Sequence, residues 1–253
     1  MIDLSNKTIL VIGSIHNMAL GVAETLHSAG AEIILAPDQN YTIDAQFSAR
    51  VQYVTLDDPI QLNEQIQSLG KIDGAILSPS WFKFNHFLDT TAADWDAALA
   101  QNFEFMTYAA QAIARHLIAQ GSGGRLIFLS SVASMMPLVE TSIVGTSLTA
   151  LWALAKMAAV DLGPHGITVN IIASGWIESE WTKPYLYPVG RNTIQQGIPL
   201  GRIGTPQDVG NLCCFLASDL AAYITGVIIP VDGGYLLTPA EQGHSPYPEK
   251  SDV

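Results

Sequence analysis

Short, unbroken apolar segments alternate along the chain with longer segments of helical periodicity, and this alternation constrains the fold most. The apolar segments read "TILVIG", "EIILAP", "DGAILSPS", "RLIFLSS", "TVNIIASG" and "VIIPVDGG". Strands without polar alternation are typical of a sheet that is covered on both faces. Helical segments between such strands give βαβ units with parallel strands. The sequence therefore predicts an α/β fold: a Rossmann-like, doubly wound parallel sheet in a single domain.

The carboxyl-terminal end differs from the rest of the chain. We predict one domain over residues 1–237, because no repeat, low-complexity tract or linker interrupts the alternation there. Residues 238–253, "TPAEQGHSPYPEKSDV", form a polar, proline-bearing tail. Such a tail is either mobile or laid across a neighbouring subunit.

Composition narrows the possible partners. The 253 residues are 49% hydrophobic and only 13% charged, which leaves little charge to cover a monomer and favours an oligomer. The formal net charge of −12 repels a phosphate backbone, so we expect no nucleic-acid partner. No run of about 18 continuous apolar residues and no basic leader is found, so we expect no membrane partner and a cytoplasmic location. The adjacent Cys213 and Cys214 are interpreted as buried apolar side chains, and no metal site is expected.

Four segments carry a resemblance to a known family. They are "AQNFEF", "LIFLSS", "GITVNIIASGWIESEWTK" and "IPLGRIGTPQDVGNLCCFLASDLAAYITGVIIPVDGGY". With these the chain resembles the short-chain dehydrogenase/reductase (SDR) family over residues 5–235. The resemblance implies a dinucleotide-binding fold and a nicotinamide-dependent oxidoreductase, but the activity has to be argued from the site.

The reactive group of that family is incomplete here. It consists of a serine, a tyrosine thirteen positions later and a lysine four positions beyond. The lysine stabilises the phenolate of a group whose pKa is ordinarily about 10. Ser131 matches the serine, but Val144 and Leu148 stand at the other two positions, and neither carries a proton or a charge. Lys156 lies eight residues past Leu148, or about 12 Å along a helix, and cannot substitute. Ser131 and Asn102, which stands at the family's asparagine, are remnants. We expect Ser131 to bond local backbone groups and Asn102 to satisfy a break in its own helix.

The cofactor signature is degenerate as well. The glycine turn after the first strand has Gly13, but Asn17 and Ala19 stand where the family has its other two glycines. Asp38 follows the second strand one place later than the family's ribose-binding acid, and Ser78 lies in "LSPS", where the family has "NNAG". We therefore expect no cofactor in this chain, and NAD(P) in a partner subunit.

These observations leave three hypotheses. The first is a catalytically silent, structural subunit that pairs in a heterotetramer with an active relative, which carries NAD-dependent oxidation of an alcohol or hydroxyacyl-CoA. The second is a non-redox, halohydrin-dehalogenase-like lyase, because "KPYLYPVG" at 183–190 is similar to the halide loop of those enzymes. Its acid or base would come from Tyr185, Tyr187, Glu178, Glu140 or His86. The third is a nucleotide-binding regulatory protein.

For the first hypothesis we expect the subunit interface on two helices, at about 95–119 and 142–163. Met106 and Trp152 are large apolar residues on these helices. A charged replacement of either residue should split the assembly, if its side chain faces the partner rather than the subunit core.

Overall fold

The computed structural model describes residues 2–15, 17–37, 50–51, 59–179, 182–186 and 190–238. Asp38, Tyr187 and all of the predicted tail except Thr238 lie outside the described residues, and so do the side chains of Asn17 and Tyr185. The predictions made for these positions therefore remain predictions.

A parallel sheet forms the centre of the molecule, with strand order β3-β2-β1-β4-β5-β6-β7. The strands are β1 (Thr8–Gly13), β2 (Glu32–Pro37), β3 (Arg50–Val51), β4 (Gly74–Ser78), β5 (Gly124–Ser131), β6 (Ile167–Ser174) and β7 (Ile228–Val231). The chain order reverses between β1 and β4, and ligands bind at such a switch point in open α/β sheets. The predicted doubly wound parallel sheet in a single domain is confirmed.

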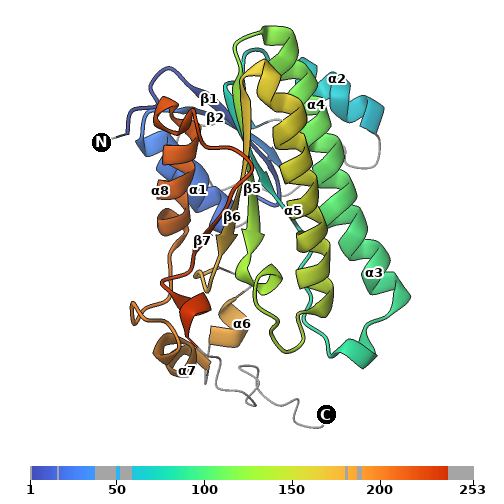
Figure 1. The fold of residues 1–253 in the computed structure, drawn as a ribbon, viewed down its shortest axis with the longest axis vertical. Helices are drawn as coiled ribbons and strands as arrows, with labels where there is room; N and C mark the ends of the chain where they lie inside the picture. Colours follow the sequence, from blue (N-terminus) through green and yellow to red (C-terminus); the bar gives the residue numbers. More distant parts are fainter. Residues whose placement is uncertain are drawn as a thin grey trace.

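Helices cover both faces of the sheet (Figure 1). One layer holds α1 (Asn17–Ser28) and α8 (Pro206–Ala217); the other holds α2 (Pro59–Gln67), α4 (Phe105–Gln120) and α5 (Ser142–Leu162). Shorter helices lie toward the carboxyl ends of the strands: α3 (Ala92–Leu99), α6 (Lys183–Leu186) and α7 (Gly190–Gln196). Each layer encloses its own apolar core, which explains why the strands show no polar alternation.

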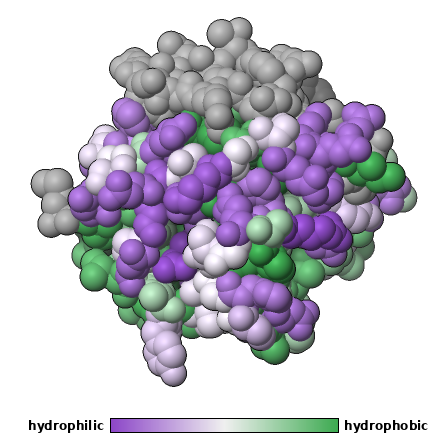
Figure 2. All heavy atoms as spheres, turned by 90° about the horizontal axis from the view of Figure 1, so that it is seen from above, coloured by the Kyte–Doolittle hydropathy of each residue, from purple (hydrophilic) through white to green (hydrophobic). Residues whose placement is uncertain are grey.

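The end of the molecule that lies away from α6 and α7 is mostly polar where the structure describes it. Figure 2 looks down on the top of Figure 1, and most described residues on that face are hydrophilic, with hydrophobic residues toward the edges of the view.

Two sequence-based expectations about helices α4 and α5 need correction. With the turn that follows, over Ser142–His165, it is long and apolar enough to span a membrane by length and composition, although no continuous apolar run predicted this. Core helices of soluble proteins pass the same test, and Leu151 and Ala155 of α5 lie in the main core. The condition that Met106 of α4 and Trp152 of α5 face a partner, on which the effect of their charged replacements depends, is not met. Met106 is fully buried in its own subunit, and the indole of Trp152 donates a hydrogen bond to Ser130 Oγ at 2.7 Å.

The cysteines are core residues, as predicted. Cys213 and Cys214 lie buried in α8. Burial raises the pKa of the Cys214 thiol to about 11 and that of the Cys213 thiol further above its ordinary value. Both thiols are therefore protonated at neutral pH and act as small apolar groups.

Two glycines let α1 and α8 pack closely. A Cβ at Gly21 would lie 2.4 Å from Cβ of Pro206, and one at Gly210 would lie 2.6 Å from the side chain of Thr25. Gly21, which is extra to the family's glycine turn, is thus required by packing between these helices.

We predict that Gly21→Ala destabilises the protein. Alanine gains about 1 kcal/mol of helix propensity, but overpacking against the rigid ring of Pro206 costs about 1–3 kcal/mol. The net loss of about 1 kcal/mol should lower Tm by about 2–4 °C in calorimetry. Gly163→Ala is the matched control, because no described atom lies within 4 Å of the place that its Cβ would take. An equal response of the two variants would contradict the packing argument.

Candidate functional site

A small cavity opens at the carboxyl ends of β5 and β6. Its volume is about 110 Å³, and its lining is mostly apolar. The described lining residues are Met18, Phe82, Phe84, Ser131, Val132, Ala133, Leu138, Thr141, Ser174, Gly175, Trp176, Ile177, Ser179 and Thr182. Ligand pockets for larger molecules usually measure about 300–1,000 Å³, so this cavity has room for only a small ligand.

The two positions of the missing proton relay lie in a separate apolar cluster. Val144 and Leu148 point from α5 and are 1% and 0% exposed. They pack with Ala98 and Ile143, and with the partly buried aromatic side chains of Trp81, Phe82 and Trp95. Hydrocarbon therefore fills the space at these two positions, and no described group in the cluster can exchange a proton there.

The aromatic segment that contributes to this cluster is held at several points. It follows β4 after Pro79 and Ser80, as "WFKF" at 81–84. Lys83 Nζ lies 2.7 Å from Asp94 Oδ1, and this hydrogen bond is the largest cause that lowers the pKa of Asp94 to about 2. Asp94 also forms a capping box with Thr91 at the start of α3. Sequence reasoning missed this role, although four residues with three aromatic rings shortly after a buried strand were a usable signal.

Ser131 ends β5 and makes a local backbone bond. Its Oγ accepts a hydrogen bond from Ala133 N at 3.2 Å and caps the short 3-10 turn Val132–Ser134. The same side chain lines the cavity. Lys156 is exposed on α5, and it does not line the cavity.

Asn102 is fully buried in a π-helical turn, Ala100–Glu104, between α3 and α4. Its Oδ1 accepts from Trp81 N at 3.0 Å, and its Nδ2 donates to Trp81 O at 2.8 Å and to Ser147 Oγ at 3.1 Å. We expected Asn102 to satisfy a break in its own helix. The helix does depart from α geometry here, but the side chain binds the aromatic segment and α5 instead.

We predict that Asn102→Ala lowers the free energy of unfolding by about 2–4 kcal/mol. The variant leaves buried partners unsatisfied, at about 1–3 kcal/mol for each group. Gln101→Ala is the control, because Gln101 Oε1 only accepts from Ser80 Oγ and is half-buried. Denaturant titration measures both variants. A loss below that of Gln101→Ala would show that the Asn102 bonds contribute little.

The residues at the family's glycine turn, after β1, are packed against neighbouring elements. Gly13 has φ +102°, and a Cβ there would lie 2.2 Å from the carbonyl oxygen of Ser78. Ser14 N donates to that oxygen at 3.0 Å. Gly13 is therefore required by the close approach of β1 to β4, whether or not a dinucleotide binds. Ser78 and Ala19 are buried, and Asn17 is the first residue of α1.

The acid and base candidates of the lyase hypothesis do not line the cavity where the structure describes them. Glu178 forms an ion pair with Arg191. Glu140 has φ +63°, and its carbonyl oxygen accepts a hydrogen bond from Asn85 N at 3.0 Å. His86 precedes the short 3-10 turn Phe87–Asp89. Of the five candidates, Glu140, Glu178 and His86 are thus placed outside the lining.

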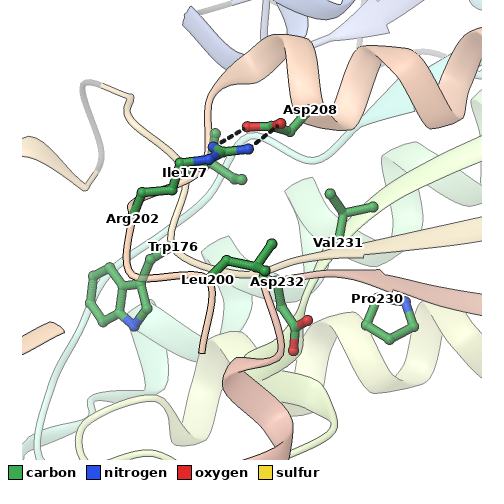
Figure 3. Close-up of a pocket in the computed structure, with 10 residues that line it drawn as sticks. Trp176, Ile177, Leu200, Arg202, Asp208, Pro230, Val231 and Asp232 are labelled. Carbon is green, nitrogen blue, oxygen red and sulfur yellow. Dashed lines mark hydrogen bonds and ion pairs between the residues drawn. The ribbon is translucent and has the colours of Figure 1, made fainter. Parts of the chain in front are cut away.

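A second cavity, of about 230 Å³, is drawn in Figure 3, and Trp176 and Ile177 line both cavities. Arg202 Nη1 and Nη2 each lie 2.8 Å from a carboxylate oxygen of Asp208, and this pairing holds the Asp208 pKa well below its ordinary value. The Asp232 carboxylate accepts from the backbone N–H groups of Gly234 and Leu236, each at 2.9 Å. These charged groups are thus bound to local partners.

Within the described residues, no three His, Cys, Asp or Glu side chains could hold a metal ion.

The sheet and the site together define a Rossmann-like α/β protein with its cleft at the carboxyl ends of the strands. The sequence profile described as Enoyl-(Acyl carrier protein) reductase matches residues 13–236. The chain belongs to the short-chain dehydrogenase/reductase family of oxidoreductases.

Named relatives are similar over nearly the whole chain. L-xylulose reductase from Bos taurus is 28% identical over 244 residues, which cover 93% of this chain and 98% of that protein. The 3-oxoacyl-(acyl-carrier-protein) reductase FabG from Aquifex aeolicus is 30% identical and covers 92% and 98%. The solved gluconate 5-dehydrogenase from Burkholderia cenocepacia, in complex with NADP and tartrate, has a TM-score of 0.85 at 25% identity and covers 94% and 98%.

Proposed function

We propose that this chain is a catalytically silent, structural subunit of a hetero-oligomeric short-chain dehydrogenase. In this proposal a related subunit carries the NAD(P)-dependent oxidation of an alcohol or hydroxyacyl-CoA. The main observation in support is that Val144 and Leu148 are buried in an apolar cluster where the family needs a phenol and an ammonium group. The heteromeric 2-(α-hydroxybenzyl)succinyl-CoA dehydrogenase, with one degenerate subunit, is the kind of assembly that we propose.

The described residues do not fit the nicotinamide end of a cofactor. The cavity beside Ser131 measures about 110 Å³, and it is lined by Phe82, Phe84 and Met18. Two solved relatives of the same fold are described with NADP bound, so in this proposal the loss of cofactor binding is a matter of side chains and not of the sheet. We therefore derive no hydride-transfer step in this chain.

The first test has two parts. One measures cofactor binding by the isolated chain, and the other identifies the proteins that co-purify with the natively expressed chain. We expect no saturable fluorescence change with NADH or NADPH below about 10 μM, equivalent to about −7 kcal/mol. We also expect the natively expressed chain to co-purify with a second SDR subunit that has the tyrosine and lysine. Micromolar cofactor binding, or native purification as a homo-oligomer alone, would contradict the proposal.

The second test concerns the interface. Met157 and Val160 of α5 are 65% and 74% exposed, and Tyr108 of α4 is exposed on the adjacent helix. These residues replace Met106 and Trp152 as candidates for partner contact.

We predict that Val160→Glu splits the assembly, because a carboxylate buried at an apolar interface lacks a partner. Ile60→Glu is the matched control, since Ile60 is an equally exposed aliphatic residue on α2. Native mass measurement of the co-purified complex reports both. If Ile60→Glu splits the assembly and Val160→Glu does not, the interface lies on another face.

The third test is repair of the proton relay. Val144→Tyr with Leu148→Lys restores a phenol and an ammonium on one helix face, but we expect no ketone reduction with NADH or NADPH. The new ammonium enters a cluster of aliphatic and aromatic side chains and should destabilise the fold by several kcal/mol. Leu148→Met is the control that keeps apolar packing. Measurable turnover by the double variant would show that a working cofactor cleft persists.

A non-redox lyase remains the second candidate, because a cavity with a serine hydroxyl persists at Ser131. Its acid or base has to come from Tyr185 or Tyr187, since Glu140, Glu178 and His86 do not line the described cavity. Halide release from a small haloalcohol distinguishes this candidate from the silent subunit.

A further inference from the structure

The second cavity, the β7 cavity, is separate from the cleft that holds Ser131. Pro230, in β7, and Asp232, just after it, line this cavity. Its volume of about 230 Å³ is about twice that of the cavity beside Ser131, and the two share only Trp176 and Ile177 among their described lining residues. None of its described lining residues lies on α4 or α5, where the proposed partner would bind. The β7 cavity is therefore a candidate ligand site of its own.

Charge is the first property of the β7 cavity that selects a ligand. Its described lining carries two carboxylates, those of Asp208 and Asp232, and one guanidinium group, that of Arg202. One negative charge is thus in excess at the cavity, and the whole chain has a formal net charge of −12. The local and the overall charge both attract a cation and repel an anion.

Arg202 does not reverse this preference. Its two terminal nitrogens are each bound to Asp208 at 2.8 Å, in the two-point pairing drawn in Figure 3. An anionic ligand at Arg202 would therefore lie beside the Asp208 carboxylate, and like charges at such short range repel each other.

The two carboxylates keep acceptor capacity after their local hydrogen bonds are counted. A carboxylate has about four lone-pair sites. Each oxygen of Asp232 accepts one backbone N–H. Asp208 Oδ1 accepts only from Arg202 Nη2 within the described structure, whereas Oδ2 also binds the N–H and the hydroxyl group of Thr205. An ammonium group has donors and no acceptor, so it matches the sites that remain.

The other side chains of the lining are apolar, and they select the body of the ligand. They are those of Trp176, Ile177, Leu200, Pro230 and Val231. A metal ion gains nothing from such a lining, and no three metal-binding side chains come together in the described part of the chain. An organic cation instead removes hydrocarbon from water when it binds there.

We infer that the β7 cavity binds a small organic amine in its ammonium form, with an apolar body of about one ring. An engineered apolar cavity of about 150 Å³ holds benzene, so the larger volume here admits a six-membered ring with an aminomethyl group. The inference goes beyond the proposed function, because it requires neither a partner subunit nor a dinucleotide. No reaction is assigned to the site.

Benzylamine is the probe, and the full chain is titrated at neutral pH while amide shifts are followed by NMR. We expect saturable shifts at Gly204 and Gly233, which line the β7 cavity only, and none at Ser131 and Ala133, which line the other cavity only. Benzyl alcohol keeps the ring without the charge, and benzoate reverses the charge. Both should bind about tenfold more weakly or worse. Equal binding of either compound, or saturable shifts confined to Ser131 and Ala133, would overturn the inference.

Two exposed leucines provide a matched test of the location. Leu200 lines the β7 cavity and is 69% exposed, whereas Leu220, in the 3-10 turn Asp219–Ala221, is 73% exposed and does not line it. Leu200→Lys adds an ammonium group of the protein itself at the lining and should weaken benzylamine about tenfold. Leu220→Lys adds the same charge elsewhere and should have little effect. Equal effects of the two variants would show general charge repulsion and refute the site.

A second pair of variants tests the excess carboxylate. Asp232→Asn removes its charge and should weaken benzylamine about tenfold. Asp219→Asn is the control, because Asp219 pairs with Lys7 and does not line the cavity. Unchanged affinity in a folded Asp232→Asn would refute the site, and if that variant does not fold, the leucine pair still decides. None of these results bears on co-purification or NADPH binding, which test the silent-subunit proposal separately.

Discussion

Burial of the parallel sheet on both faces is the constraint on which the rest of the structure depends. Residues of β1, β2 and β4 contribute to two separate apolar cores, one under α1 and α8 and one under α2, α4 and α5. Helices must therefore lie close to the strands and to one another. Gly21 and Gly210 satisfy that requirement between α1 and α8, and Gly13 satisfies it between β1 and β4. Residues that a family comparison assigns to a cofactor can thus be retained for packing alone.

The same constraint explains the identity of the residues at the relay positions. Burying a valine or leucine side chain stabilises a fold by about 1.5–3 kcal/mol. Burying an ammonium group costs several kcal/mol unless it is paired. Apolar side chains such as Val144 and Leu148 therefore favour stability at these positions, provided that neighbours fill the space. Trp81, Phe82 and Trp95 pack there. The silent subunit that we propose would in this way follow the trade-off between stability and activity.

The sequence predicted the architecture well because strands that are buried on both faces consist almost entirely of apolar residues, and this composition can be recognised in the sequence. Every residue of β4 and β6 is buried, so neither segment has polar alternation to confuse the assignment. Prediction was poorer for side-chain direction on helices that are apolar on more than one face. On α5, Trp152 faces the core while Met157 and Val160 face outward, and the residue types alone do not separate these cases.

The candidate site was predictable only in part for a related reason. Aligned positions identified Val144 and Leu148 as departures from the family, but they could not show that residues 81–84 would pack beside them. That contact joins segments about sixty residues apart in sequence and depends on Asn102, which binds both the backbone of Trp81 and the Ser147 hydroxyl. A single asparagine therefore holds the aromatic segment against α5. Its role follows from distances that a sequence does not contain.

The two halves of the cleft are built differently, and the difference has a physical cause. The half formed by α3, α5 and residues 81–84 consists of side chains, which can be replaced by larger apolar groups until the space is filled. The half at the ends of β5 and β6 is fixed by backbone pairing, with Ser131 opposite Ser174 in the parallel register. Those strand ends cannot move together without breaking the sheet. The hollow beside Ser131 is therefore a consequence of the fold.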